Sequence, residues 1–241
     1  MRDLRTRYGR THLGYLMAVA WPLSHLVTIV ILMSLANRVT PLGNDPAVFV
    51  SSGVMPYILC LYPARMMGIA IETNKPLFLF PVIKPIYIII SRGIIEFLTA
   101  FLVVILFFAG ALAYGVDIVP PDPAMWGAAV SSTIYLSICM GFLNTVVSSI
   151  FKMWNILFMV LMFALYSTSG VFILPSTLSQ EVRDAMWFNP LVHCVEWIRA
   201  SYYEGYGDDM LSPAYLIGIA TFFLFLSLLG ERFLRGKLLS P

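Results

Sequence analysis

Six long apolar stretches divide the chain, and each is close to the length of a membrane-spanning helix. A helix that crosses about 30 Å of hydrocarbon needs roughly 20 residues, because each residue adds about 1.5 Å. Polar and turn-forming residues gather in the connections between the stretches. The pattern therefore predicts six transmembrane helices, over Leu13–Ala36, Val48–Ile71, Gly93–Tyr114, Ala124–Ile150, Trp154–Leu174 and Pro213–Leu229.

Two shorter helical regions complete the predicted fold. In Met1–Thr11, four arginines lie opposite a narrow apolar arc, which is typical of a helix on the membrane surface. An arginine cluster that only orients the chain is the alternative. Between the last two spans, Ser179–Phe188 and Pro190–Tyr203 predict a helical hairpin tucked into the outer leaflet, within residues 178–203.

Composition agrees with this architecture. Of the 241 residues, 59% are hydrophobic and only 12% are charged, which excludes a soluble globular domain. The three cysteines lie on separate segments, so they predict packing residues and no disulfide framework. The fold class is therefore an all-α polytopic membrane protein with a single transmembrane domain over residues 1–241.

Positive charge is distributed unequally between the two ends of the predicted helices. With the N-terminus inside, eleven of the fifteen basic residues lie in the cytoplasm: Arg2, Arg5, Arg7, Arg10, Lys75, Lys84, Arg92, Lys152, Arg232, Arg235 and Lys237. Arg38, Arg183 and Arg199 then lie outside. Because lysine and arginine collect on the cytoplasmic side, we predict that both termini are cytoplasmic and that this basic face meets anionic lipids.

No catalytic motif stands out. The chain has no G-x-x-x-x-G-K-[ST] segment, so we expect no nucleotide hydrolysis by this chain alone. It also has no H-E-x-x-H, no G-x-S-x-G and no cysteine spacing that suits a metal. We therefore expect no catalytic residue, no metal and no bound cofactor, and the placement of the charges gives no reason to expect nucleic-acid binding.

Two charges fall inside the predicted spans. Arg65 is in the second and Glu96 in the third, both toward the cytoplasmic ends. A charge at the bilayer centre costs about 2.5–3.5 kcal/mol on insertion scales, so such residues usually have a partner or a function. An Arg65–Glu96 ion pair between antiparallel helices is one interpretation, and separate extension of each side chain to the interface is the other.

Aromatic side chains are frequent within the predicted spans and suggest a path for sugars. Pyranose rings stack on flat aromatic faces while their hydroxyl groups need hydrogen-bond partners. Ordinary helix packing and interfacial belts are the alternative for each single ring. The candidates for a substrate path are Trp21, His25, Tyr57, Tyr62, Trp154, Phe158 and Tyr166.

Two connections carry further candidate sites. The cytoplasmic segment NKPLFLFPVIKP (Asn74–Pro85) would expose Leu77–Phe80, which predicts either docking of a partner protein or anchoring in the interface. Pro76 suits the first turn of a short helix there, and Pro81 and Pro85 are expected to stop it. In the external hairpin, His193, Glu196 and Arg199 share one arc that we expect to face water or a cavity, with a surface Glu196–Arg199 ion pair.

Two segments resemble a known transporter family. RDLRTRYGRTHLGYLMAVAWPLSHL (Arg2–Leu26) is similar to the start of ABC-2 type permeases that export bacterial surface polysaccharide, although Met17 stands where tryptophan is common. SGVFILPSTLSQEVRDAMWFNPLVHCVEWIRASYYEGY (Ser169–Tyr206) resembles their P-x-x-L-P…NP-[LV]-x-[HY]-x-[IVL]-E-x-[IVL]-R segment, especially in capsular polysaccharide export permeases. The resemblance covers essentially the whole chain.

The resemblance implies a function and a set of partners. Such permeases are homodimers in the bacterial inner membrane, and each protomer binds a separate ATPase subunit that uses the ATP. Their cargo is a lipid-linked polysaccharide, which close relatives pass to periplasmic and outer-membrane proteins. The family's coupling helix would correspond to residues 74–85, with Lys75, Leu77, Phe78, Phe80 and Lys84. Its external hairpin would correspond to Leu178–Tyr203, with gate candidates His193, Glu196 and Arg199.

Other functions remain open from the sequence. The same architecture also serves export of O-antigen, drugs, haem or lipids. A membrane enzyme acting on lipid-linked sugars is less consistent, because no paired carboxylates or metal ligands lie near the end of a span. A purely structural membrane anchor would leave the aromatic residues and the external hairpin unexplained.

Overall fold

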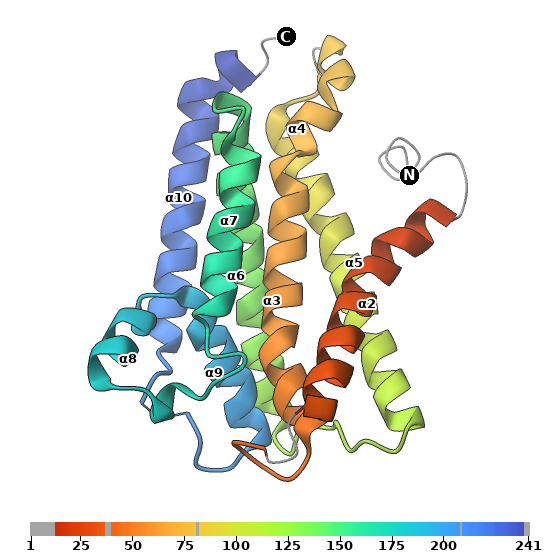
Figure 1. Cartoon of the computed structure of the whole chain (residues 1–241). Helices are drawn as coiled ribbons and strands as arrows, with labels where there is room; N and C mark the ends of the chain where they lie inside the picture. Colours follow the sequence, from red (N-terminus) through yellow and green to blue (C-terminus); the bar gives the residue numbers. More distant parts are fainter. Residues whose placement is uncertain (1–12, 37–39, 81, 208, 239–241) are drawn as a thin grey trace.

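The computed structural model describes residues 13–36, 40–80, 82–207 and 209–238, and these residues form helices and loops without strands (Figure 1). The interfacial helix predicted for Met1–Thr11 lies outside the described residues. The helices, in chain order, are α2 (Leu13–Ala36), α3 (Pro46–Gly68), α4 (Ala70–Thr73), η1 (Lys75–Leu79), α5 (Pro85–Ala113), α6 (Pro123–Ile150), α7 (Trp154–Ser167), η2 (Pro175–Thr177), α8 (Gln180–Trp187), α9 (Pro190–Tyr202) and α10 (Pro213–Leu238).

Proline and a capping side chain set where several of these helices begin. Proline is the first residue of α3, α5, α6, α9 and α10, where the missing N–H removes no hydrogen bond. Asp45, Asp122 and Asn189 precede three of these prolines, and each accepts a hydrogen bond from a backbone N–H of the first turn at 2.8–2.9 Å. Pro85 therefore starts α5, and the prediction that it stops a helix is wrong.

The described structure contains five helices that are long and apolar enough to cross a membrane: α2, α3, α5, α6 and α10. Two of them extend beyond their predicted ends, since α5 begins at Pro85 instead of Gly93, and α10 continues to Leu238. Because α5 begins two turns earlier, Arg92 lies inside a helix and not in the cytoplasmic connection where the sequence placed it. Long apolar helices with many exposed Leu, Ile and Phe side chains, as on α5 and α10, suit a lipid environment.

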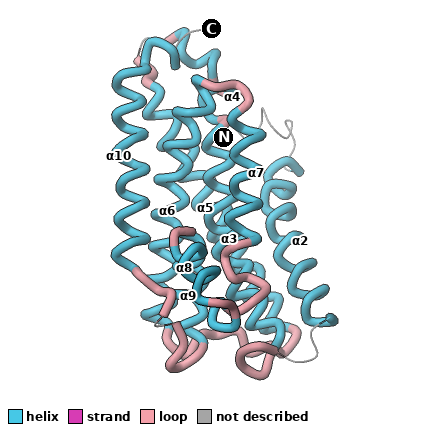
Figure 2. Tube along the Cα trace, turned by 60° about the vertical axis from the view of Figure 1, so that its left-hand side comes forward, coloured by secondary structure: helices cyan, strands magenta, loops and turns pink. Residues whose placement is uncertain are grey.

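The fifth predicted span, Trp154–Leu174, is only partly helical. Helix α7 ends at Ser167 after 14 residues, which is about 21 Å and too short to cross the hydrocarbon alone. Gly170 follows with φ +77, a left-handed conformation that favours glycine. The chain then turns into α8 and α9, which lie at the end of the bundle opposite α4 and the C-terminus (Figures 1 and 2).

Helix α3 occupies the centre of the bundle. It packs against α2, α5, α6, α7 and α9, and 18 of its 23 residues are buried (Figure 1). Glycine permits the closest approach to α6, since a Cβ at Gly68 would overlap the Asn144 amide and one at Gly141 would overlap Met67. The core of the protein is therefore the α3–α6 interface, and the other long helices surround it.

Hydrogen bonds between helices reinforce this interface. Four polar side chains of α6 lie at residues 137, 144, 145 and 148, along one face of the helix. Each donates to a backbone carbonyl oxygen of α3: Ser137 to Cys60 (2.9 Å), Asn144 to Ala64 (2.9 Å), Thr145 to Met67 (2.7 Å) and Ser148 to Gly68 (2.5 Å). A carbonyl oxygen has two lone pairs, so it can accept these bonds in addition to those of its own helix.

We predict that Thr145→Val destabilises the protein by about 1 kcal/mol, because the variant keeps the shape of the side chain but loses its hydrogen bond to α3. Thermal unfolding in detergent would measure the change. Thr133→Val is the matched control, since Thr133 is also buried on α6 but donates to the Ala129 carbonyl of its own helix. Equal losses for the two variants would show that the contact with α3 adds nothing.

Candidate functional site

Four of the predicted substrate-path residues meet in one aromatic cluster where α2, α3 and α7 pack together. His25 of α2 and Tyr62 of α3 are hydrogen-bonded at 2.8 Å between Nδ1 and Oη. The Tyr57 ring lies 3.9 Å from that of Tyr166 on α7 and 5.6 Å from that of His25, measured between centroids. Phe172, which the sequence did not single out, contacts Tyr166 at 5.5 Å. The cluster joins aromatic faces to hydroxyl groups where the central helix α3 meets α2 and α7.

The other three path candidates are not part of this cluster. Trp21 is 70% exposed and borders, together with Tyr62 of the cluster, a cavity between α2, α3 and α5. Trp154 donates from Nε1 to Oδ1 of Asn144 at 2.9 Å, which joins the start of α7 to the α3–α6 interface. Phe158 is buried beside Trp154, with ring centroids 6.4 Å apart. Phe158, Met162 and Tyr166, spaced four residues apart, form the buried face of α7, and the structure shows helix packing for Trp154 and Phe158.

Among the residues whose side chains the structure describes, Arg199 is the largest that is fully buried. Its guanidinium donates to the carbonyl oxygens of Gly170 (2.6 Å) and Val171 (2.8 Å), in the non-helical segment after α7. It also lies 4.4 Å from the centroid of the Phe49 ring on α3. One side chain of α9 therefore satisfies carbonyl groups that the end of α7 leaves without helical partners, and fixes them against the central helix.

Glu196 is the ionic partner of Arg199. Its Oε1 is 3.6 Å from Nη1 of Arg199 and accepts a hydrogen bond from Tyr206 at 3.0 Å. Burial raises the pKa of Glu196 above its usual value, against the opposing effects of Arg199 and Tyr206. The ion pair predicted from the i,i+3 spacing is confirmed, but its predicted surface location is wrong, because Arg199 is 0% and Glu196 2% exposed.

His193 is also fully buried and joins three segments at the end of the bundle that carries α8 and α9. Its Nδ1 accepts from the Ser212 backbone N–H at 3.1 Å, just before α10, so Nε2 carries the proton and donates to the Trp187 carbonyl at 2.8 Å. Burial lowers the pKa of His193, which keeps the ring neutral as these bonds require. The polar stripe of α9 thus faces the protein interior and not water, because α3, α6 and the α7 break cover it.

The cytoplasmic connection predicted to bind a partner protrudes at the end of the bundle opposite α8 (Figure 1). We call residues 74–85 the coupling loop. Phe78 is partly buried against Met67, Ile71, Ile89 and Phe142, so it anchors the loop to the bundle. Leu79, Phe80 and Val82 are 83%, 59% and 82% exposed, and Lys75 and Lys84 are exposed beside them. Val82 was not singled out from the sequence, although its position between two prolines indicated a loop.

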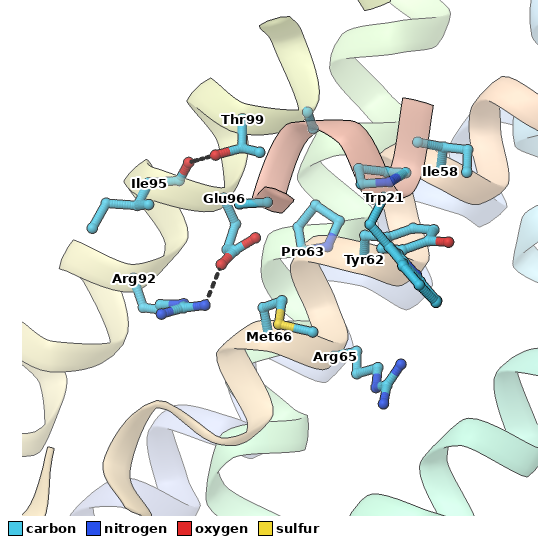
Figure 3. A pocket seen from close by; sticks show the side chains of 13 residues that line it. Trp21, Ile58, Tyr62, Pro63, Arg65, Met66, Arg92, Ile95, Glu96 and Thr99 are labelled. Carbon is cyan, nitrogen blue, oxygen red and sulfur yellow. Dashed lines mark hydrogen bonds and ion pairs between the residues drawn. The ribbon is translucent and has the colours of Figure 1, made fainter. Parts of the chain in front are cut away.

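A polar cavity lies between α2, α3 and α5, with a volume of about 260 Å³ (Figure 3). Arg92 and Glu96 of α5 form an i,i+4 ion pair at 2.5 Å on its wall. Arg65 of α3 borders the same cavity, but it points away from Glu96 in Figure 3. Glu96 thus pairs within its own helix, where the sequence suggested Arg65 as its partner. The i,i+4 spacing of Arg92 and Glu96 was the signal that could have shown this pair.

Within the described residues, no group of three His, Cys, Asp or Glu side chains is placed to hold a metal ion. Cys60, Cys139 and Cys194 are free and buried, in agreement with their interpretation as packing residues. The candidate sites are therefore the aromatic cluster, the coupling loop, the α8–α9 hairpin and the polar cavity.

We predict that Arg199→Met destabilises the protein by about 3 kcal/mol or more, because it leaves Glu196 and two carbonyl groups buried without their partner. Arg183→Met is the control, since Arg183 pairs with a 75% exposed Asp209 and such pairs contribute at most about 1 kcal/mol. Thermal unfolding in detergent distinguishes them. Adding Glu196→Gln to Arg199→Met should recover part of the lost stability. If Arg199→Met destabilises the protein no more than Arg183→Met does, the proposed role of the buried Arg199 contacts is wrong.

We also predict that His193 makes the external end sensitive to acid. Its pKa is lowered from 6.5 in the folded protein, so its contribution to stability is complete above about pH 6.5 and is lost as the pH falls below this value. Glu196 acts in the opposite direction, because its raised pKa favours the folded state at lower pH. Thermal unfolding of wild type and His193→Gln at pH 7.5 and 5.5 separates the two contributions. The wild type should lose more stability on acidification than the variant, and parallel losses would refute the role of His193.

Comparison with known proteins identifies relatives along almost the whole chain. No protein-family model matches the sequence. The chain is 31% identical over 230 residues to the polysialic acid transport protein KpsM of Escherichia coli, which covers 95% of this chain and 88% of KpsM. It is 26% identical over 222 residues to the capsule polysaccharide export inner-membrane protein CtrC of Neisseria meningitidis serogroup B, covering 90% of this chain and 82% of CtrC.

A third relative is the capsule polysaccharide export inner-membrane protein BexB of Haemophilus influenzae, with 23% identity over 220 residues, 88% of this chain and 79% of BexB. The apolar helices of the structure suit the membrane location that two of the names state. The chain belongs to the family of inner-membrane permeases of the ABC-2 type that export capsule polysaccharide.

Proposed function

We propose that this chain is the transmembrane subunit of an ATP-driven exporter that moves capsule polysaccharide across the bacterial inner membrane. The observation that carries the proposal is the similarity to capsule export and polysialic acid transport proteins over nearly the entire chain. The expected cargo is a lipid-linked polymer. ATP would be used by a separate subunit, since the sequence contains no phosphate-binding loop.

The proposed topology has six crossings with both termini in the cytoplasm. The long helices alternate in direction along the chain, and α7 runs opposite to α6 before it stops (Figure 1). The segment 168–178 and the α8–α9 hairpin would cover the remaining depth of the fifth crossing. The exposed basic residues Lys75, Lys84, Lys152 and Arg232 lie at the end with the coupling loop, as the positive-inside rule requires for a cytoplasmic face.

The aromatic cluster is the proposed contact region for the polysaccharide. Its members come from α2, α3 and α7, and both α2 and α7 also present exposed apolar side chains. Two copies of the chain that face each other across these helices would enclose a path lined by aromatic and hydroxyl groups. A homodimer is therefore part of the proposal, with the path between the protomers.

The α8–α9 hairpin would close this path on the external side. His193, Glu196 and Arg199 contribute by holding the hairpin to α10, to α3 and to the break after α7, since they are buried and do not line an opening. The exposed outer face of α8 is available to the periplasmic and outer-membrane export proteins that the family resemblance implies.

The coupling loop would bind the ATPase subunit. Leu79, Phe80 and Val82 form an exposed apolar group flanked by Lys75 and Lys84, at the proposed cytoplasmic end. Such a group at the tip of a loop suits insertion into a groove of a partner protein. Phe78 would transmit movement of the loop to the bundle, because it packs where α3, α5 and α6 meet.

A deletion strain complemented with variants tests the function and the docking surface together. We predict that Phe80→Asp abolishes association with the ATPase subunit and leaves the polysaccharide inside the cell, because an exposed anchor of the interface is replaced by a charge. Copurification of the ATPase subunit and surface staining of the capsule are the two measurements.

Phe188→Asp is the matched control, since Phe188 is 69% exposed and directly follows α8, which lies at the opposite end of the protein, and the change should not affect ATPase association. Normal association of Phe80→Asp would refute the docking role of the loop. A deletion strain that still displays its full capsule would refute export of this polymer, and an O-antigen, drug or lipid would then be the cargo to examine.

A further inference from the structure

The polar cavity between α2, α3 and α5 has a composition that the aromatic path does not explain. Its walls include Trp21, Tyr62 and Thr99, but its charged groups are Arg65, Arg92 and Glu96 (Figure 3). Among the described residues that line the cavity, two guanidinium groups and one carboxylate sum to a net charge of about +1, and Arg92 pairs with Glu96. Charges inside a membrane protein are costly and usually mark a binding site or an ion pathway.

The guanidinium N–H groups of Arg92 and Arg65 differ in their hydrogen-bond partners. Arg92 is 5% exposed, and its Nη2 pairs with Glu96 while its Nε finds no acceptor among the described residues. A buried N–H without a partner costs about 1–3 kcal/mol, which favours a ligand or water there. Arg65 is exposed on a helix that is otherwise almost entirely buried, so its five N–H groups are open to a ligand at the mouth of the cavity.

The charged side chains of the cavity lie on the parts of α3 and α5 toward the coupling loop, where we place the lipid head groups. Arg65 is three residues from the end of α3, about 5 Å along its axis, and Arg92 is seven residues, or about 10 Å, after the start of α5. Helix α5 has 29 residues and is longer than the hydrocarbon is thick, so its first turns extend beyond the acyl chains. An anion with a lipid tail that enters this cavity would therefore meet the exposed Arg65 at its border and the buried Arg92 on its wall.

We propose that this cavity binds the phosphodiester of a lipid head group in the leaflet on the coupling-loop side. Arginine suits this role because its planar fork pairs with two phosphate oxygens at once. A phosphodiester carries one negative charge, which matches the net charge of the cavity. The volume of about 260 Å³ accommodates a head group, whereas the tail would lie in the bilayer between α2 and α5.

The phosphate can come from a membrane phospholipid or from the lipid that carries the polysaccharide, because both present the same group at this depth. The site itself rests on the geometry of Arg65 and Arg92 and does not depend on the proposed export function. The capsule experiment with Phe80→Asp and the lipid-binding experiment below can therefore fail separately.

Native mass spectrometry of the detergent-purified protein tests the site with phosphatidylglycerol as the probe. Protein from a host that makes no capsule should retain phosphatidylglycerol, but not diacylglycerol, which lacks the phosphate. Arg65→Gln should reduce retention about tenfold, as expected for loss of a charge-assisted contact. Arg232→Gln is the matched control and should change it less than about twofold, because Arg232 is an exposed arginine on α10, outside this cavity.

A second arm identifies the source of the phosphate. Protein purified from cells that make the polymer would carry an additional Arg65-dependent mass if the site holds the polymer's lipid. If only phosphatidylglycerol depends on Arg65, the ligand is a membrane phospholipid. Retention by Arg65→Gln equal to wild type in both arms, or no retained lipid in wild type, would overturn the proposal. Arg65 is exposed, so unfolding of the variant is not expected and an unchanged melting temperature would confirm this.

Discussion

The buried guanidinium of Arg199 makes it possible for helix α7 to end inside the protein. A buried backbone carbonyl group that leaves its helix has no water to bond with, and each unsatisfied group costs several kcal/mol. The carbonyl groups of Gly170 and Val171 have left their helix, and Arg199 donates to both of them. The cation is in turn held by Glu196 and by the ring of Phe49. Without this contact, the break after α7 and the hairpin that follows it would lack support.

The α3–α6 interface solves a related problem by a different route. Hydrophobic burial does not drive helices together in lipid, so close backbone approach and interhelical hydrogen bonds are needed. Gly68 and Gly141 permit the approach, and hydroxyl and amide groups of α6 bond to carbonyl oxygens of α3. The result is a rigid centre on which α2 and the short α7 lie, together with the aromatic cluster between them. A transporter needs a rigid centre with other helices packed around it, because some helices must keep their positions while others move.

At both ends of the bundle, a histidine or aromatic side chain fixes a connection between helices to the buried part of the protein. At the end with the coupling loop, Phe78 fixes the loop while Phe80 protrudes, and the Arg92–Glu96 pair lies on the next helix. At the other end, His193 links α9 to the residues around Trp187 and Ser212. Movement at either connection is therefore transmitted to buried contacts. Coupling of ATP use to opening of an export path would require this property.

Many elements could be predicted from the sequence. The hairpin was placed within one residue of its observed helices, and five long helices lie where the apolar stretches predicted them. Four of the seven path candidates form one cluster in the structure. The sequence pattern could not distinguish these four from Trp154 and Phe158, which pack between helices. The missed boundaries have local causes. Isoleucine and tyrosine before Arg92 allow α5 to begin at Pro85, and Gly170 ends the helical part of the fifth stretch early.

Hydropathy and charge in the sequence by themselves determined that this is a helical membrane protein. Apolar segments of this length cross a membrane as helices, because a helix satisfies all its backbone hydrogen bonds internally. Two segments, Arg2–Leu26 and Ser169–Tyr206, carry its resemblance to polysaccharide exporters. Only the tertiary structure decided that Arg199 is buried and not at the surface, and that Glu96 pairs with Arg92. The reason is that burial and pairing depend on which helices meet, and helical spacing alone describes one face of one helix without showing what covers it.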